Sequence, residues 1–120
     1  MRKIERLMNQ AILNNQNWKL DNTEVVFDEH DCVSRVYLHG NHIATVGDDY
    51  VQLFDGGWQS NTTKSRLNAI CQENAIAGEG VFQKSYTWFV RQYNNVTKSF
   101  ETIPFYSGLN LGDSALPICA

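Results

Sequence analysis

The residues best suited to chemistry lie in the stretch GGWQSNTTKSR at positions 56–66, immediately before an apolar run with helical spacing. The N–H groups at the start of a helix lack intrahelical partners and carry partial positive charge, so they suit a phosphate or a carboxylate. Hydroxyl, amide and basic side chains gather at this start. The predicted ligand-binding residues are Asn61, Thr62, Thr63, Lys64 and Arg66.

This stretch does not match either common nucleotide-binding pattern. A Walker A loop requires glycine directly before its lysine, whereas Thr63 precedes Lys64 here, and no G-x-G-x-x-G run occurs. Cations at a helix N-terminus oppose the macrodipole by a few tenths of a kcal/mol or more, and a bound anion would relieve that conflict. The alternative is that Ser60, Asn61 or Thr62 merely caps the helix while Lys64 and Arg66 reach solvent. Both interpretations stay open.

Two histidines flank the predicted Gly40-Asn41 turn, and pairing across it would set His39 opposite His42 and Leu38 opposite Ile43. A zinc site needs three or four ligands, and no third ligand can be named. We therefore predict no metal and no cofactor. The chain also has no G-x-S-x-G, H-E-x-x-H or Cys/His signature, which favours a protein without catalytic activity.

Aromatic and basic residues alternate late in the chain. Tyr86, Trp88, Tyr93 and Phe100 lie near Lys84, Arg91 and Lys98. A sheet face with exposed aromatic rings between cations would suit stacking on single-stranded nucleic acid. The alternative is that Trp88, or Phe89 on the opposite face, belongs to the core. Without the strand register, the exposed face cannot be assigned.

Composition bounds the class of protein. A chain of 120 residues with 42% hydrophobic residues favours one globular domain over intrinsic disorder. Acidic residues dominate positions 21–55, where Arg35 is the one basic residue, so the remaining basic residues could form a basic face or ordinary solvated surface. No signal peptide and no membrane-spanning run is evident, and Cys32, Cys71 and Cys119 are spread singly, which is typical of free thiols. We therefore predict a cytoplasmic protein that does not enter a membrane.

The elements that must position these residues are read from periodicity and turn residues. An amphipathic helix is predicted over 2–17 and a second helix from 60–62 to a point before Gly78. Strands are predicted over 25–27, 35–39, 42–46, 50–54, 81–84, 87–91 and 96–100, and residues 105–120 are predicted to be loop or tail. The prediction is a single α+β domain over 1–120, with an antiparallel sheet of about five to six strands packed by both helices.

Four segments also carry a family resemblance. They are NWKLDNTEV (17–25), RVYLHGNHIATV (35–46), GGWQSNTTKSRLNAI (56–70) and VFQKSYTWFV (81–90). These segments resemble a family of small proteins of tailed bacteriophages, including phages of marine cyanobacteria, for which no activity is assigned. The resemblance implies a phage origin and action in a host bacterial cytoplasm. It carries over no catalytic residue.

The functional prediction combines these observations. We expect a non-catalytic binding module that contacts nucleic acid or another phosphate-bearing ligand through the helix start at 60–66. The first alternative is a protein–protein interaction module, acting as a host-takeover factor or as a homo-oligomer. The second is an enzyme of unknown type.

Overall fold

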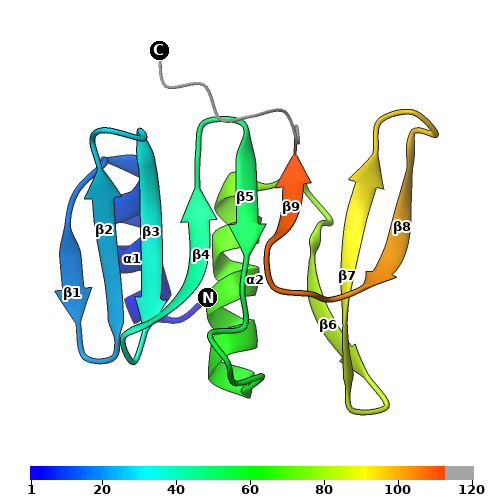
Figure 1. Ribbon diagram of the computed structural model, residues 1–120, viewed down its shortest axis with the longest axis horizontal. Coiled ribbons are helices and arrows are strands. Elements are labelled where there is room, and N and C mark those ends of the chain that lie inside the picture. The colour runs from blue at the N-terminus through cyan, green and yellow to red at the C-terminus, as the bar shows by residue number, and fades with distance from the viewer. Residues whose placement is uncertain (113–120) are drawn as a thin grey trace.

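Two helices lie against one face of a six-stranded antiparallel sheet, and a three-stranded antiparallel sheet stands beside it in the computed structural model, which describes residues 1–112 (Figure 1). The strand order is β1-β2-β3-β4-β5-β9 in the larger sheet and β6-β7-β8 in the smaller one. The helices are α1 (Lys3–Leu13) and α2 (Asn61–Asn74). The strands are β1 (Trp18–Leu20), β2 (Thr23–Asp28), β3 (Val33–Leu38), β4 (Asn41–Val46), β5 (Tyr50–Leu53), β6 (Gly80–Lys84), β7 (Thr87–Asn94), β8 (Ser99–Pro104) and β9 (Leu109–Gly112).

The predicted α+β class with two packed helices is confirmed, but the strands form two sheets instead of one. The tail supplies one of the unexpected strands. Leu109–Gly112 was predicted to be loop, yet it pairs antiparallel with β5, with Leu53 opposite Leu109 and Val51 opposite Leu111. Burial of Leu109 and Leu111 explains this correction, because both leucines occupy the core-facing positions of a short alternating strand. The rest of the predicted tail, residues 113–120, lies outside the described residues.

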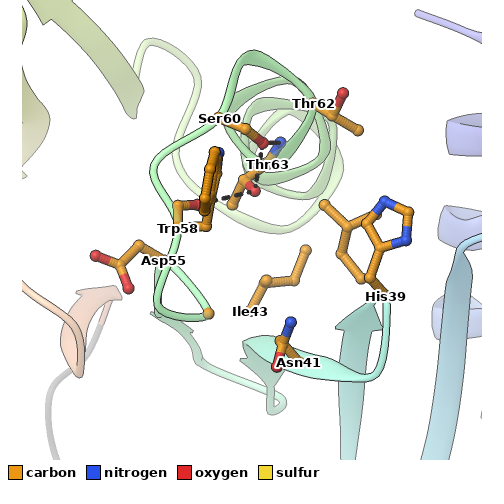
Figure 2. Close-up of a pocket in the computed structure, with 10 residues that line it drawn as sticks. His39, Asn41, Ile43, Asp55, Trp58, Ser60, Thr62 and Thr63 are labelled. Atoms are coloured by element: carbon orange, nitrogen blue, oxygen red, sulfur yellow. Dashed lines mark hydrogen bonds between the residues drawn. The ribbon is translucent and has the colours of Figure 1, made fainter.

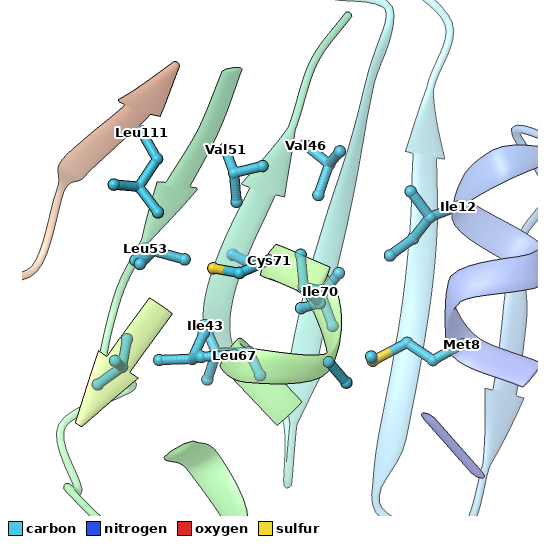
Figure 3. Close-up of a cluster of buried hydrophobic side chains, with 14 of the residues drawn as sticks. Met8, Ile12, Ile43, Val46, Val51, Leu53, Leu67, Ile70, Cys71 and Leu111 are labelled. Atoms are coloured by element: carbon cyan, nitrogen blue, oxygen red, sulfur yellow. The ribbon is translucent and has the colours of Figure 1, made fainter. Parts of the chain in front are cut away.

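The core forms between α2 and the larger sheet (Figure 3). Leu67, Ile70 and Cys71 of α2 lie against apolar side chains of β4, β5 and β9. Met8 and Ile12 of α1 extend the same cluster over the β2 side, consistent with an amphipathic helix whose apolar stripe faces inward. The smaller sheet joins this cluster through Val81, Trp88 and Val90. One side of the smaller sheet is therefore fixed against the rest of the molecule.

The hairpin between β3 and β4 has different turn residues from those predicted. His39 and Gly40 form the turn with positive φ values of 52° and 78°, so Leu38 pairs with Asn41 and Tyr37 with His42. A two-residue turn of this kind needs positive φ at both central positions, and these two residues supply it. The predicted pairing of His39 with His42 and of Leu38 with Ile43 is therefore wrong. A bulge between Val36 and Tyr37 shifts the register further.

The cysteines only partly follow the prediction. Cys71 is free and 1% exposed on the inner side of α2. Cys32 is disulfide-bonded, so the prediction of free thiols is wrong for this residue. Pairing of a cysteine depends on what the fold brings near it, which the linear spacing of single cysteines does not reveal. Cys119 lies outside the described residues.

Candidate functional sites

The start of α2 is built from a glycine turn and a serine cap. Gly56 and Gly57 adopt positive φ values of 69° and 87°, which side chains other than glycine rarely tolerate. The backbone of Ser60 is extended, and its Oγ accepts the Thr63 N–H at 3.1 Å. Ser60 is therefore the N-cap among the three predicted candidates. Its hydroxyl also lies 2.9 Å from Thr63 Oγ1, which ties the first turn to the loop.

A groove of about 410 Å³ lies between this helix start and the β3–β4 hairpin (Figure 2). Trp58 borders it on one side with 75% of its surface exposed, and Thr62 and His39 line the side across from Trp58 (Figure 2). Asp55 contributes a carboxylate, whose Oδ1 accepts the Gly57 N–H at 2.8 Å. The described lining includes no lysine or arginine. With neither a lysine nor an arginine in its described lining, this groove is a poor site for a phosphate.

Lys64 lies outside this groove. Its Nζ donates to Oε1 of Gln83 in β6 at 3.3 Å. This contact brings Lys64, which is half-buried, beside the smaller sheet. Of the other predicted residues, Asn61 is exposed, Thr62 is half-buried and Thr63 is buried. The structure therefore places the predicted hydroxyl and amide side chains apart from the side chains of Lys64 and Arg66, the two predicted cations.

Arg66 does not lie on the surface at all. Its side chain is 4% exposed and forms an ion pair with Glu5 of α1, with 2.9 Å between Nη1 and Oε2. Nε donates to Thr23 Oγ1 at 3.0 Å, and Nη2 donates to Asn22 Oδ1 at 3.4 Å. The expectation that Arg66 reaches a ligand at the helix start does not fit this position. A buried guanidinium needs a partner, and Glu5 supplies it from a segment 61 residues away.

The carboxylate of Glu5 is held ionised within the same cluster. Burial alone would raise the pKa of Glu5, but hydrogen bonds from Ser65 Oγ, the Arg2 N–H and Arg66 outweigh burial. The net result is a pKa below the usual value. The sequence carried no local sign of this cluster, because α1, α2 and the start of β2 meet only in the folded chain. Its role is to join three elements.

The smaller sheet presents an aromatic and basic open face, which its register defines. Directly paired residues share a face, and the pairs on the outer face are Phe82 with Phe89, Gly80 with Arg91 and Tyr93 with Phe100. Lys84, Thr87, Thr102 and Pro104 share this face and are exposed. We call these ten residues the aromatic face.

The opposite face of the smaller sheet is the core side. Trp88 and Val90 are 4% and 0% exposed, and the Trp88 ring meets Phe105 edge-on at 5.3 Å. Of the two interpretations left open by the sequence, Trp88 is therefore core and Phe89 lies on the open side. Tyr86 belongs to neither face, because it occupies the β6–β7 turn with a positive φ of 65° and is 94% exposed.

The rings on the aromatic face form two contacting pairs. Phe82 and Phe89 are stacked with centroids 5.7 Å apart, and Tyr93 and Phe100 meet edge-on at 5.3 Å. Arg91 lies between the pairs along β7, with its guanidinium carbon 4.4 Å from the centre of the Phe100 ring. A shallow hollow of about 560 Å³ is lined by Phe82, Arg91, Phe100 and Thr102. This surface combines flat apolar rings with a fixed cation.

The two histidines considered for a metal are separated. His39 lies in the turn, whereas the His42 ring lies on the open side of the larger sheet, 4.4 Å from the Phe54 ring centre. His42 Nε2 lies 2.8 Å from Thr45 Oγ1, and burial lowers the pKa of His42. Among residues 1–112, no three His, Cys, Asp or Glu side chains are grouped for metal binding.

Comparisons with known proteins give a family match and nothing more. The family model described as Kyanoviridae Gp96 protein matches residues 1–112, in agreement with the predicted resemblance to cyanophage proteins. No curated protein and no solved structure matches the chain. In the described part of the chain, neither helix has the length and apolar character needed to cross a membrane.

Proposed function

We propose that this chain, which belongs to the Kyanoviridae Gp96 protein family, is a non-catalytic binding module for nucleic acid or another phosphate-bearing ligand. The observation that carries the proposal is the charge of the aromatic face. Its charged strand residues, Lys84 and Arg91, are both basic and exposed. Lys64 adds a cation beside this face, because it contacts Gln83 at the β6 edge, on the side of the smaller sheet opposite the aromatic face. Phosphates are the ligands that such an arrangement attracts.

The helix start contributes only its accessible part to the proposed surface. Asn61, Thr62 and Lys64 are reachable from solvent, whereas Thr63 and Arg66 are buried and are left out. The ion pairs in the described chain involve Arg35 and Arg66. Lys64, Lys84 and Arg91 therefore keep their charge available for a ligand.

Labelled single- and double-stranded DNA and RNA, titrated at low salt and followed by anisotropy, test the proposal. We expect binding whose affinity falls steeply as salt is added, because each phosphate contact releases counterions. Lys64→Ala combined with Lys84→Ala should weaken binding and reduce the salt slope. Lys19→Ala is the matched control, because Lys19 is an exposed lysine on β1 at the far edge of the larger sheet. No binding to any of these probes at low salt would refute the proposal.

A protein–protein interaction module is the second candidate, and the exposed Trp58 beside its groove favours it. Tryptophan is enriched among residues that dominate binding energy at interfaces. The partner would be a host protein or a second copy of the chain. We expect Trp58→Ala to abolish a defined complex, detected by light scattering or by capture from host lysate, with Tyr106→Ala as an exposed aromatic control. A monomer that captures nothing would count against this candidate.

We also propose that the protein acts in the host bacterial cytoplasm, which its phage family supports. The disulfide at Cys32 is the opposing observation, because disulfides are uncommon in a reducing cytosol. Rapid alkylation of thiols in producing cells, followed by peptide mapping, tests the proposal. Alkylated Cys32 is expected for a cytoplasmic protein, and Cys32 fully protected until reduction would argue against that compartment.

A further inference from the structure

We infer that the aromatic face binds single-stranded nucleic acid, with bases stacked on the Phe82–Phe89 and Tyr93–Phe100 pairs and a phosphate held by Arg91. The inference rests on the proposed function, which names nucleic acid as a class of ligand. It adds that this nucleic acid is single-stranded and that its bases stack on the aromatic rings. It depends on three observations: the geometry of the rings, the charges on the face, and the lack of an element covering the face among residues 1–112.

The rings are held as a platform by the strands beneath them. Phe82 and Phe89 are register partners on β6 and β7, and Tyr93 and Phe100 are register partners on β7 and β8. The two pairs are therefore fixed relative to each other by β7, four residues apart. That separation is about 13 Å along a strand.

The platform is reachable from solvent. Phe82 and Phe100 are each 37% exposed, and the exposed Thr102 and Arg91 complete the shallow hollow between them. Gly78 lies close to Phe100, because an added Cβ there would lie 2.8 Å from the ring. The Arg91 guanidinium lies over this ring, 4.4 Å from its centre, so a base at Phe100 would meet the ring and the cation together.

The charges distinguish a nucleic acid from an apolar protein surface as the occupant. No aspartate or glutamate belongs to the aromatic face in β6, β7 or β8, because Glu101 pairs with Gln92 on the opposite face. Glu79 is buried and accepts the N–H groups of Ile76 and Tyr93. An apolar partner would cover Arg91 without pairing it, which is costly, whereas a phosphate would pair it.

The rings favour a single strand over a duplex. Base faces within a duplex are covered by neighbouring bases, so aromatic side chains recognise unpaired bases that can be splayed onto them. Stacking of this kind tolerates any base, because every base offers a flat face. The expected ligand is therefore single-stranded DNA or RNA with weak sequence preference.

The test titrates the whole chain with a labelled single strand of about ten nucleotides, the same strand lacking its bases, and the matching duplex. We expect the intact single strand to bind most tightly. Phe82→Ala and Phe100→Ala should each weaken its binding at least about fivefold, within the range typical of lost base stacking. Phe100→Leu should weaken it similarly, because leucine keeps apolar bulk without a flat ring. Tyr106→Ala is the control and should leave binding unchanged.

The outcomes separate this inference from the proposed function. Equal affinity for the abasic strand or the duplex, with no effect of the Phe82 and Phe100 variants, would overturn the inference while leaving phosphate binding intact. Loss of binding to every probe would overturn both. Self-association that Phe100→Ala abolishes, without any oligonucleotide binding, would assign the face to a second copy of the chain. Circular dichroism and thermal unfolding of each variant verify that reduced binding is not unfolding.

Discussion

Arg66 Nη1 lies 2.9 Å from Glu5 Oε2, and both side chains are almost completely buried. This ion pair links α2 to α1, and the bond from Arg66 Nε to Thr23 Oγ1 adds the start of β2. The residue that the sequence placed at a ligand site is thus an internal connector. Buried pairs of this kind matter most when one partner is removed, because the other charge is left uncompensated.

Arg66→Met should destabilise the protein by about 3–5 kcal/mol, the usual cost of breaking a buried pair. The measurement is urea unfolding at neutral pH. The double variant Glu5→Leu with Arg66→Met should recover much of this loss, since no unpaired charge then remains. Equal destabilisation by the single and double variants would contradict the explanation.

The Glu5 carboxylate should make stability fall in acid. Its pKa is lowered from 4.5 in the folded protein, so its stabilising contribution is complete above that value and is lost as the pH falls through the folded pKa. Glu5→Gln should therefore be less stable at neutral pH and should show a flatter decline below about pH 4.5. Thermal unfolding across pH 2–7 measures both effects. Glu101→Gln, at an exposed position, is the control and should retain the wild-type decline.

Ser60→Ala should cost about 1 kcal/mol, because the hydroxyl that accepts the Thr63 N–H is lost. Thr62→Ala should change stability much less, since the Thr62 side chain is not the cap. Guanidinium unfolding of the two variants provides the comparison. A larger loss for Thr62→Ala would reassign the cap.

Gly78→Ala should destabilise the protein and displace Phe100, because the new Cβ would lie 2.8 Å from that ring and φ is 100°. Gly40→Ala is the matched control, with φ of 78° and no atom within 4 Å of the added Cβ. The excess loss of Gly78→Ala over Gly40→Ala isolates the contact with Phe100. Denaturant unfolding gives the energies, and similar losses in both variants would mean that Phe100 moves aside freely.

The Cys71 thiol should be unreactive in the folded protein. Burial, aided by the nearby charge of Glu79, raises the pKa of Cys71 to about 12, so little thiolate forms at pH 8. We expect a maleimide to modify Cys71 only after unfolding, as followed by peptide mass mapping. Fast modification in native buffer would show that α2 opens locally.

The sequence predicted local elements well where a strong pattern was present. The turn at Ser85-Tyr86 and the strands around it were located correctly, because a two-residue turn between alternating runs is a local signal. Strand β9 was missed because its four residues carry only two leucines in alternation. The β3–β4 turn was misplaced by one residue, because His39 can adopt the positive φ that had been assigned to Asn41.

The candidate sites were likewise predicted in part from the sequence and decided in part by the tertiary structure. By itself, the sequence determined the start of α2, the presence of aromatic and basic residues late in the chain, and the membership of a phage family. The tertiary structure decided that Arg66 points inward, that the groove beside α2 has no lysine or arginine in its described lining, and that Phe89 lies outward while Trp88 lies inward. The reason is physical: helix and strand periodicity depends on neighbours in sequence. Burial of a charge and the choice of the covered sheet face depend on segments brought together only by folding.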